Sequence, residues 1–320
     1  MRIHQTVAGQ LQRPPDICSR PFDGYRKKQT TKVNVTDVAK AAGVSVATVS
    51  RSFNLPAHVR DAVREKVLKI AGELGYMPNA SAKALRLRKT NIIGAIVPTL
   101  THSIYSTMMN SFQQEMARYG YVVCILTCGF DSAAILNSAK KLIEQGVEGL
   151  LVVGQISDQA TIDYINSHQT PVVCTYSFIR EHAFPCIGFD NYQSSQVVAE
   201  YMLGLGHRNF CLLTGPMQGN DRQQARTQAF IDTLSNFHEV CRYRMYECQP
   251  EFTISFGEQS LRRAQLDFPE ATAIVCNSDV IAFGVLSACK RVGINVPQDL
   301  SVVGFDNLEF SEYLNPPLPP

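Results

Sequence analysis

Cationic and hydroxyl side chains are concentrated in the first third of this 320-residue chain, at spacings that suit the binding of phosphate groups. Residues 79–89 hold four cationic side chains in eleven positions, in the segment NASAKALRLRK. The short hydroxyls of Ser45, Thr48 and Ser50 suit phosphate oxygens, and Arg51 can reach the O6/N7 edge of a guanine. These residue types indicate a polyanionic partner at this end of the chain.

The charge distribution along the chain supports the same partner. Residues 1–90 carry 17 Lys and Arg against 6 Asp and Glu, a formal charge of +11, whereas the remainder carries 13 against 22, a charge of −9. The net charge of +2 conceals this basic headpiece and acidic body. Residues 1–31 show little periodicity and predict a disordered tail, either a solvated leader or a source of loose attraction to phosphates.

Short helices must position these side chains, and residues 32–78 predict three of them. Asn34 can cap a helix that runs through Ala42, and Ser45 can cap a second helix that runs through Asn54. The apolar run over residues 59–74 predicts a third helix. Two short helices joined by a turn and followed by a supporting helix describe a helix-turn-helix unit.

Residues 91–320 show a different pattern, in which apolar β-rich runs alternate with amphipathic helical stretches. Strands that are apolar along their whole length predict parallel sheets covered by helices on both faces. Two sets of such strands predict two doubly wound lobes, an α/β fold in which ligands lie beyond the carboxyl ends of the strands. The strand runs are IIGAIV, YVVCIL, GLLVV and PVVCTY, then NFCLLTG, AIVCN and SVVGFD.

Several classes of protein are disfavoured by what the sequence lacks. No run of 18 apolar residues predicts a membrane span, and the first residues lack the apolar core of a secretory signal, so we expect a cytoplasmic protein. No nucleophile elbow, phosphate-binding loop or metalloprotease motif indicates an enzyme. The ten cysteines lie mostly in apolar runs without a CxxC pair, so we expect buried thiols, no metal site and no cofactor.

Three segments together resemble the lactose-repressor (LacI/GalR) family of bacterial transcription regulators, and the resemblance runs from about Asn34 to the end of the chain. They are TDVAKAAGVSVATVSRSFN, REKVLKIAGELGYMPNASAKAL and IIGAIVPTLTHSIY. The resemblance implies a helix-turn-helix headpiece and a core like that of periplasmic sugar-binding proteins. It also implies a homodimer or tetramer that binds palindromic operator DNA and a small-molecule effector.

The second headpiece helix would then be the recognition helix. Val46 and Ala47 match the two positions that most often set operator preference in the family, and both are small and apolar. They can touch thymine methyl groups but cannot donate hydrogen bonds, so direct readout depends on Arg51. Asn54 and His58 match family positions that touch DNA, although either could serve only as a turn residue.

Residues 79–90 match the family's hinge, which forms a short helix when two copies meet over the minor groove. The small Ala82 would permit close approach, and Leu85 matches the leucine that is wedged into a central base step. Arg86 and its cationic neighbours would neutralise phosphates. A basic linker without structure is the alternative interpretation of this segment.

The resemblance also implies an effector cleft at the strand ends of the two lobes. Asp190 and Asp306 could instead cap the helices that follow them, and Arg222 could be a solvated charge. Tyr176 stands where the family commonly has an aspartate, and two arginines remain, which favours a sugar acid or a phosphorylated sugar over a neutral sugar. The implied contacts are Tyr105, Tyr176, Asp190, Arg222, Arg226, Asp279 and Asp306.

The sequence therefore predicts a DNA-binding transcriptional repressor that is controlled by a small-molecule effector. Two alternatives remain open: a sugar-binding protein without a role in transcription, and a truncated regulator defective in dimerisation. The second arises because family members continue past the PPL motif, whereas this chain stops at LNPPLPP and is expected to lack the last elements of its first lobe.

Overall fold

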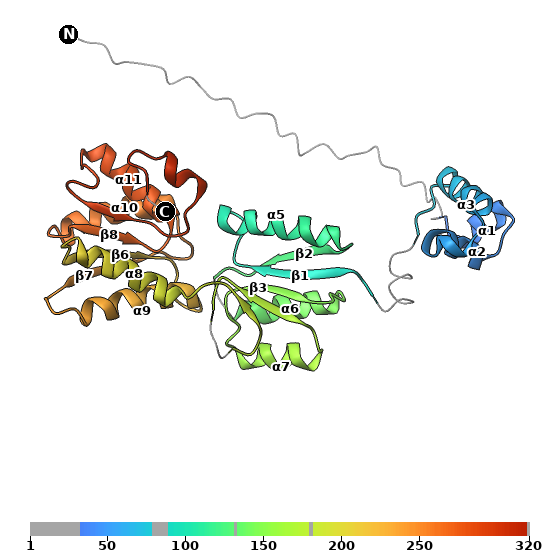
Figure 1. Ribbon diagram of the computed structural model, residues 1–320, viewed down its shortest axis with the longest axis horizontal. Coiled ribbons are helices and arrows are strands. Elements are labelled where there is room, and N and C mark those ends of the chain that lie inside the picture. Colours follow the sequence, from blue (N-terminus) through green and yellow to red (C-terminus); the bar gives the residue numbers. More distant parts are fainter. Residues whose placement is uncertain (1–32, 79–88, 131–132, 179–181, 319–320) are drawn as a thin grey trace, which may run out of the picture. The chain divides into compact units, whose positions relative to one another are not determined.

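The computed structural model describes residues 33–78, 89–130, 133–178 and 182–318 (Figure 1). The chain divides into two compact units, Met1–Lys83 and Ala84–Pro320, which are described separately below. The predicted tail at residues 1–31 lies outside the described residues, as do Ala82, Leu85 and Arg86 of the hinge.

The first unit contains the three expected helices. They are α1 (Val35–Ala42), α2 (Val46–Asn54) and α3 (Asp61–Glu73), with a short 3-10 turn, η2 (Pro56–His58), between the last two. Their buried faces meet in one small core, formed by Val38, Ala39, Ala42, Val49, Val67 and Ala71. The third helix starts at Asp61, later than residue 59, and Arg60 occupies its N-cap without a side-chain capping hydrogen bond.

Capping interactions fix the start and the end of the first helix. The Asn34 side chain accepts hydrogen bonds from the main-chain N–H groups of Thr36 and Asp37, and the Asp37 carboxylate accepts from Asn34 N at 2.9 Å. Gly43 ends the helix at φ 67°, a left-handed conformation that suits glycine. The tight turn that follows places Ser45 at the start of α2.

The second unit contains two lobes, each built on a parallel sheet. The sheet of the first lobe has the order β2-β1-β3-β4-β5. Helix α5 packs on one face, and α6 and α7 lie on the other (Figure 1). These elements are β1 (Ile92–Val97), α5 (Ser103–Arg118), β2 (Val122–Thr127), α6 (Ala134–Glu144), β3 (Leu150–Val153), α7 (Gln159–Ser167), β4 (Val172–Thr175) and β5 (Cys186–Ile187).

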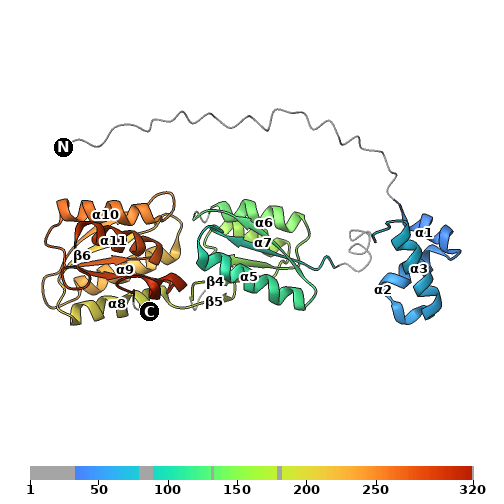
Figure 2. The ribbon, with the colours of Figure 1, turned by 90° about the horizontal axis from the view of Figure 1, so that it is seen from above.

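The sheet of the second lobe has the order β7-β6-β8-β9 and is also parallel. Helices α8 and α9 pack together on one face, and α10 and α11 pack together on the other (Figures 1 and 2). The elements are α8 (Asn191–Gly204), β6 (Asn209–Thr214), α9 (Asp221–Ser235), β7 (Arg242–Glu247), α10 (Ile254–Asp267), β8 (Ala273–Cys276), α11 (Asp279–Val292), β9 (Ser301–Val303) and η3 (Glu309–Tyr313).

The alternation of side chains along β6 explains why this strand is apolar throughout. Phe210 and Leu212 pack in the core beneath α8 and α9, whereas Cys211 and Leu213 pack in the core beneath α10 and α11. Successive residues of a strand face opposite sides, so a sheet covered on both faces needs apolar residues at every position. The prediction of two doubly wound lobes is confirmed.

Two strands lack the apolar run from which the other strands were predicted, and both lie at sheet edges. Strand β7 reads RYRMYE and exposes most of its side chains, so it carries no apolar run. Strand β5 comprises only Cys186 and Ile187. Edge strands that are short or charged are less prone to pair with other chains, which is the physical reason that they lack the signal of central strands. Among the described residues, no helix has the length and apolar character required to cross a bilayer.

Candidate functional sites

Helix α2 separates a buried face from an exposed polar face. Val49 and Ser52 are buried, whereas Val46, Ala47 and Arg51 are exposed. The Ser45 hydroxyl accepts a hydrogen bond from Thr48 N at 3.1 Å, which satisfies one main-chain donor of the first turn. The helix start and Arg51 therefore remain accessible to a ligand while the opposite face holds the core.

A surface groove of about 490 Å³ lies along this exposed face. It brings together Ser45, Thr48, Arg51 and His58 from the predicted DNA-contacting set. The groove is lined by Val44, Ser45, Thr48, Arg51, His58, Val59, Arg60 and Val63. Arg60 adds a second arginine to the groove lining.

The remaining predicted headpiece contacts lie outside this groove. The Asn54 side chain donates to the Ser50 carbonyl oxygen at 2.8 Å, and both residues are partly buried. This bond fits the alternative interpretation of Asn54 as a helix-end residue. Val46 and Ala47 are exposed at the start of the helix, where small side chains permit close approach.

Five of the predicted effector contacts line one cavity between the lobes. Its volume is about 20 Å³ in this conformation, which is room for about one water molecule. Tyr105, Tyr176, Arg222, Arg226 and Asp306 lie there with Ile104, Asn220, Gln223, Phe252 and Asn277. Most of these residues follow strand ends, as expected for doubly wound sheets.

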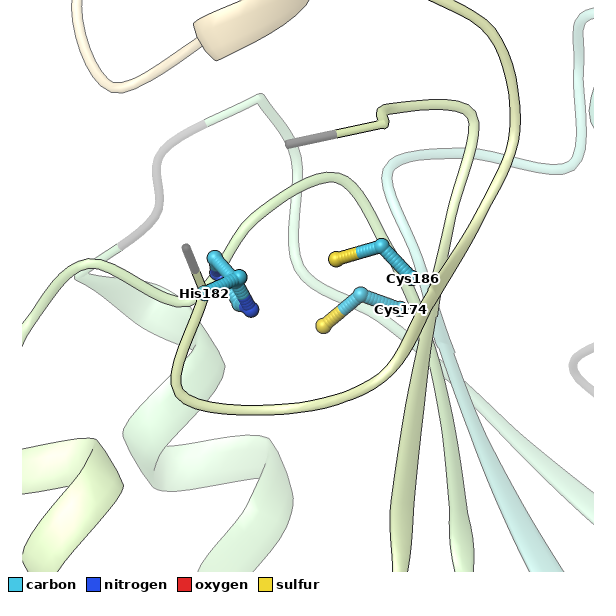
Figure 3. A group of neighbouring side chains, drawn as sticks. All are labelled: Cys174, His182 and Cys186. Carbon is cyan, nitrogen blue, oxygen red and sulfur yellow. The ribbon is translucent and has the colours of Figure 1, made fainter. Parts of the chain in front are cut away.

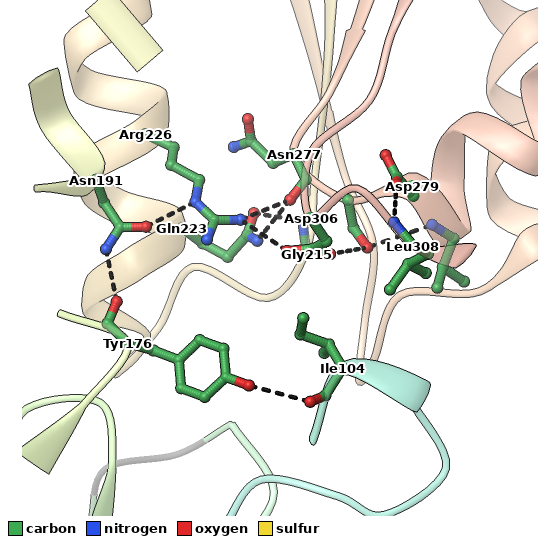
Figure 4. A network of polar contacts seen from close by, with 12 residues as sticks. Ile104, Tyr176, Asn191, Gly215, Gln223, Arg226, Asn277, Asp279, Asp306 and Leu308 are labelled. Carbon is green, nitrogen blue, oxygen red and sulfur yellow. Dashed lines mark hydrogen bonds and ion pairs between the residues drawn. The ribbon is translucent and has the colours of Figure 1, made fainter. Parts of the chain in front are cut away.

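Arg226 is the most extensively bonded side chain of the cavity (Figure 4). Its Nε donates to Asn191 Oδ1 at 2.8 Å, its Nη1 donates to the Asn277 carbonyl oxygen at 3.0 Å, and its guanidinium lies 3.5 Å from the Phe305 ring centroid. The closest oxygen of Asp306 is 3.8 Å from Nη1, longer than a charge-assisted hydrogen bond. The guanidinium of Arg226 is therefore held in place, while no carboxylate takes up its N–H donors in a close ion pair.

Burial has the largest effect on the pKa values of Arg226 and Asp306. It lowers the pKa of Arg226 to about 10, although the nearby Asp306 carboxylate acts in the opposite direction. It raises the pKa of Asp306 to about 6, and neither Arg226 nor the hydrogen bond from Ser278 offsets it fully. In both pKa shifts, the effect of desolvation exceeds the mutual attraction of the two charges. The two groups therefore do not fully satisfy each other and can bind polar groups of a ligand.

Arg222 reaches the cavity from the start of α9 beside a carboxylate. Its Nη1 donates to Asp221 Oδ1 at 2.7 Å, and the other carboxylate oxygen of Asp221 accepts from the Ser177 hydroxyl. A Cβ placed on Gly154 would lie 1.9 Å from Arg222 Nη1, so only glycine leaves room for this guanidinium. Asp221 joins the two lobes because Ser177 follows β4 of the first lobe.

The aromatic side of the cavity comes from Tyr105 and Tyr176. Their ring centroids are 5.6 Å apart, and the Tyr176 hydroxyl donates to the Ile104 carbonyl oxygen at 3.0 Å. Burial raises the pKa of both phenols, that of Tyr176 to about 12. Tyr176 and Asp306 have φ angles of 66° and 112°, so both hold a strained backbone, as residues at binding sites often do.

The structure does not bring Asp190 and Asp279 into the cavity lining. Asp190 caps α8 by accepting a hydrogen bond from Gln193 N at 3.0 Å, the alternative that the sequence left open. Asp279 is buried, and its carboxylate accepts from Leu308 N at 2.8 Å and from the Ser311 hydroxyl at 2.6 Å. It therefore orders the segment that follows Asp306 (Figure 4).

The sequence missed several amide side chains of the lining. Asn277 follows β8 directly, and Asn220 caps α9, so the rule that ligands lie at strand ends could have found both. Gln223 donates to the Asn277 carbonyl oxygen and accepts from Gly215 N, which makes it a support for two neighbouring strand ends. Phe252 had no comparable signal, because it follows β7, a strand without an apolar run that the sequence did not predict.

The first lobe also anchors the end of the segment that was predicted to be a hinge. Glu148 Oε1 accepts from Thr90 N at 2.6 Å and from Asn91 N at 2.9 Å, and Oε2 accepts from the Tyr121 hydroxyl at 3.2 Å. The hydrogen bond from Asn91 is the largest of the influences that hold the pKa of Glu148 below its usual value. The last residue of the predicted hinge, Thr90, and the residue after it are thus tied to the first lobe.

Comparison with known families agrees with both units. Residues 34–79 match the model of bacterial regulatory proteins of the lacI family. Residues 90–316 match the model of periplasmic binding proteins and the sugar-binding domain of the LacI family. The chain belongs to the LacI family. This family consists of DNA-binding transcriptional regulators, as the resemblance of the headpiece and core segments implied.

Individual LacI-family relatives extend the match over nearly the whole chain. The HTH-type transcriptional repressor CytR of Escherichia coli K12 is 31% identical over 91% of this chain and 85% of its own. The ribose operon repressor of Haemophilus influenzae is 30% identical over 88% of this chain and 84% of its own. The crystal structure of the lac repressor dimer bound to operator and an anti-inducer has a TM-score of 0.77, 27% identity, and covers 89% of this chain and 86% of that one.

These findings confirm the predicted function at the level of its class. The protein is a LacI-family transcriptional repressor that binds operator DNA and is controlled by a small-molecule effector.

Proposed function

We propose that residues 32–78 read the operator through the exposed face of α2, and that residues 79–90 and 91–320 form the hinge and the effector-binding and dimerisation domain. The observation that carries this proposal is the common groove of Ser45, Thr48, Arg51 and His58. The hydroxyls and the N–H groups at the helix start suit phosphate oxygens. Arg51 offers a planar pair of donors to a guanine, and Val46 with Ala47 provides apolar contact.

Substitution of Arg51 separates base recognition from general attraction to phosphate. The operator is first obtained by selecting bound duplexes from a random pool. Arg51→Lys keeps the charge but loses the planar fork, so it should weaken operator binding by about 1–3 kcal/mol and relax preference at one base pair. Lys69→Ala on α3 is the control, because the exposed Lys69 lies outside the groove. Equal base preference in Arg51→Lys and the unaltered protein would refute the assignment.

We propose further that the effector is a polyhydroxylated molecule with an acidic group, a sugar acid or a phosphorylated sugar. The cavity lining holds two guanidinium groups but one carboxylate, that of Asp306. At neutral pH a carboxyl with a pKa of about 6 is mostly ionised, so the positive balance of the lining comes from having two guanidinium groups there, and Asp221 outside the lining offsets part of the charge of Arg222. Amide groups of Asn220, Gln223 and Asn277 suit hydroxyl groups of the same ligand.

Thermal unfolding with matched ligand pairs tests the acidic group. Each neutral sugar is compared with its own acid and its own phosphate ester at equal concentration. At a concentration about 100 times Kd, a ligand that binds only the folded state stabilises it by about 2.7 kcal/mol. Arg226→Lys should reduce the response to the acid, because it removes the planar fork and keeps the charge. A panel in which only neutral sugars raise the melting temperature would refute the acidic effector.

The proposed coupling runs from the cavity to a dimeric hinge. Effector binding changes the angle between the lobes, and with it the spacing of the two hinge segments in a dimer or tetramer. Glu148 supports this route because it fixes Thr90 and Asn91 to the first lobe. A coupling free energy of about 1–3 kcal/mol between the two sites would be ordinary for such a regulator.

Leu85→Ala tests the hinge, since Leu85 matches the family's wedging leucine. The substitution should weaken operator binding and reduce the DNA bend, because the unstacked base step loses its apolar wedge. Bending is followed by fluorescence energy transfer across the operator, and Leu266→Ala, at an exposed leucine of α10, is the matched control. Unchanged affinity and bend in Leu85→Ala would exclude the wedge.

We also propose that the protein works in the cytoplasm and has no enzymatic activity. The family consists of DNA-binding regulators, and the cavity groups are organised for binding, with no nucleophile–base pair among the described lining residues. A folded dimer that prefers no duplex sequence at moderate salt would favour the alternative, a sugar-binding protein without a role in transcription.

A further inference from the structure

Three potential metal ligands of the first lobe lie together, and none of them lines the effector cavity. Among the described residues, Cys174, His182 and Cys186 have a Cys Sγ, a ring nitrogen and a second Cys Sγ all within 4.8 Å of one another (Figure 3). Cys174 is buried, and the other two are partly buried. Figure 3 shows both sulfur atoms pointing toward the His182 ring.

The fold explains how residues twelve positions apart supply this arrangement. Strands β4 and β5 pair in parallel, and Cys174 and Cys186 are direct partners in the register. Paired positions of neighbouring strands project to the same face of a sheet, so both thiols lie on one side. His182 belongs to the loop that connects the strands and precedes Cys186 by four residues.

The hydrogen bonding of His182 leaves one ring nitrogen without a partner. Its Nδ1 lies 3.0 Å from the Phe184 carbonyl oxygen, to which it donates in one tautomer, and 3.1 Å from Phe184 N, which donates to it in the other tautomer. Its Nε2 is buried and has no hydrogen-bond partner. When Nδ1–H donates to the carbonyl oxygen, Nε2 carries the lone pair, which is the arrangement usual for a histidine that binds a metal.

We propose that Cys174, His182 and Cys186 form a site for a thiophilic metal ion of the Zn²⁺ class, with water as the fourth ligand. Two thiolates and one imidazole suit Zn²⁺ and do not suit Mg²⁺ or Ca²⁺, which prefer oxygen ligands. Binding forms two S–metal bonds and one N–metal bond and releases two thiol protons to solvent. The two thiolates then balance the 2+ charge of the ion.

The distances require only a small adjustment. Zn–S bonds of about 2.3 Å in a tetrahedral site place two sulfur atoms about 3.8 Å apart, so the donors need to approach by about 1 Å at most. Cys174 is buried, so its thiolate is costly unless a positive charge lies beside it. The metal supplies the positive charge that this buried thiolate otherwise lacks.

Metal titration of the full-length protein tests the site without knowledge of the operator or the effector. The chain is purified without a histidine tag, reduced and stripped of metal, then titrated with Zn²⁺ or Co²⁺ against a chelator of known affinity. We expect about one ion per chain and, with Co²⁺, the near-ultraviolet absorption of thiolate-to-metal charge transfer. Absence of uptake, or uptake without thiolate absorption, would overturn the site.

Variants assign the ligands. Cys186→Ser and His182→Ala should each weaken Zn²⁺ binding by at least about 100-fold, the upper range seen for loss of an outer-shell partner. Cys124→Ser is the matched control, because Cys124 lies on β2 of the same lobe outside the cluster. Circular dichroism verifies that the variants fold. Full Zn²⁺ affinity in both ligand variants, or a Cys174–Cys186 disulfide formed in place of metal uptake, would contradict the proposal.

Discussion

The carboxyl group of Asp306 offers a quantitative test of the electrostatics of the cavity. Its side chain is 15% exposed and lies 3.8 Å from Arg226 Nη1, and burial raises its pKa from 3.8 to about 6. The unfolded chain therefore ionises this group at lower pH than the folded protein does. Its contribution to stability is fully present below about pH 3.8 and is lost as the pH rises through about 6.

The size of the effect follows from the shift in the Asp306 pKa. A difference of about 2 units corresponds to about 3 kcal/mol over the whole range. About 1.4 kcal/mol of this is lost between pH 5 and pH 8. Asp306→Asn removes the titration and keeps the shape of the side chain and its oxygen for the Ser278 hydroxyl.

The assay is urea unfolding of the wild type and Asp306→Asn at several pH values. The free energy of unfolding of the variant minus that of the wild type should rise by about 1.4 kcal/mol from pH 5 to pH 8. The change with pH is decisive, because the loss of a partner for Arg226 adds an offset that varies little over this interval. A difference that is constant with pH would refute the conclusion that burial outweighs the attraction of Arg226.

The remaining predictions concern helix packing, the hinge anchor and the headpiece. Gly284→Ala should destabilise the second lobe by about 1–3 kcal/mol in urea unfolding, because its Cβ would lie 1.9 Å from the Ile254 carbonyl oxygen of α10; Gly204→Ala, with open space around it, is the control. Glu148→Gln should lower the free energy of unfolding by about 1 kcal/mol at neutral pH and by little at acidic pH. The reason is that the stabilisation by this carboxylate is present above about pH 4.5 and is lost as the pH falls through its lowered pKa. An identical loss of stability at both pH values would contradict this. Ser45→Ala should cost the headpiece about 0.5–2 kcal/mol by circular dichroism, with Ser45→Asn restoring most of the stability.

Much of the fold was accessible from the sequence because local signals and packing agree there. Asn34 and Ser45 cap the helices that they were predicted to cap. The central strands are apolar along their length because helices cover both faces. The edge strand β7 could not be recognised in this way, because its exposed side chains do not need to be apolar.

The residues of the effector site could be predicted less well from the sequence, because the direction of a side chain and the register of a strand are properties of the folded chain. Asp190 and Asp306 both follow strands, yet Asp190 caps a helix whereas Asp306 faces Arg226. The thiol cluster shows the same limit. Metal sites are commonly recognised from ligands close in sequence, whereas here the parallel register joins Cys174 to Cys186.

The small cavity has a consequence for how an effector can act. Ligand pockets usually measure about 300–1,000 Å³, whereas this cavity has about 20 Å³, so a sugar-sized molecule cannot enter without rearrangement. Contacts between the lobes stand in its way: Asn191 Nδ2 donates to the Tyr176 carbonyl oxygen at 2.8 Å, and the Ser177 hydroxyl donates to Asp221. An effector that enters must displace or replace such contacts, so its affinity differs between lobe arrangements. That difference in affinity is what allows a ligand to shift a conformational equilibrium, and the lobe that bears Glu148 would pass the shift to Thr90 at the end of the hinge.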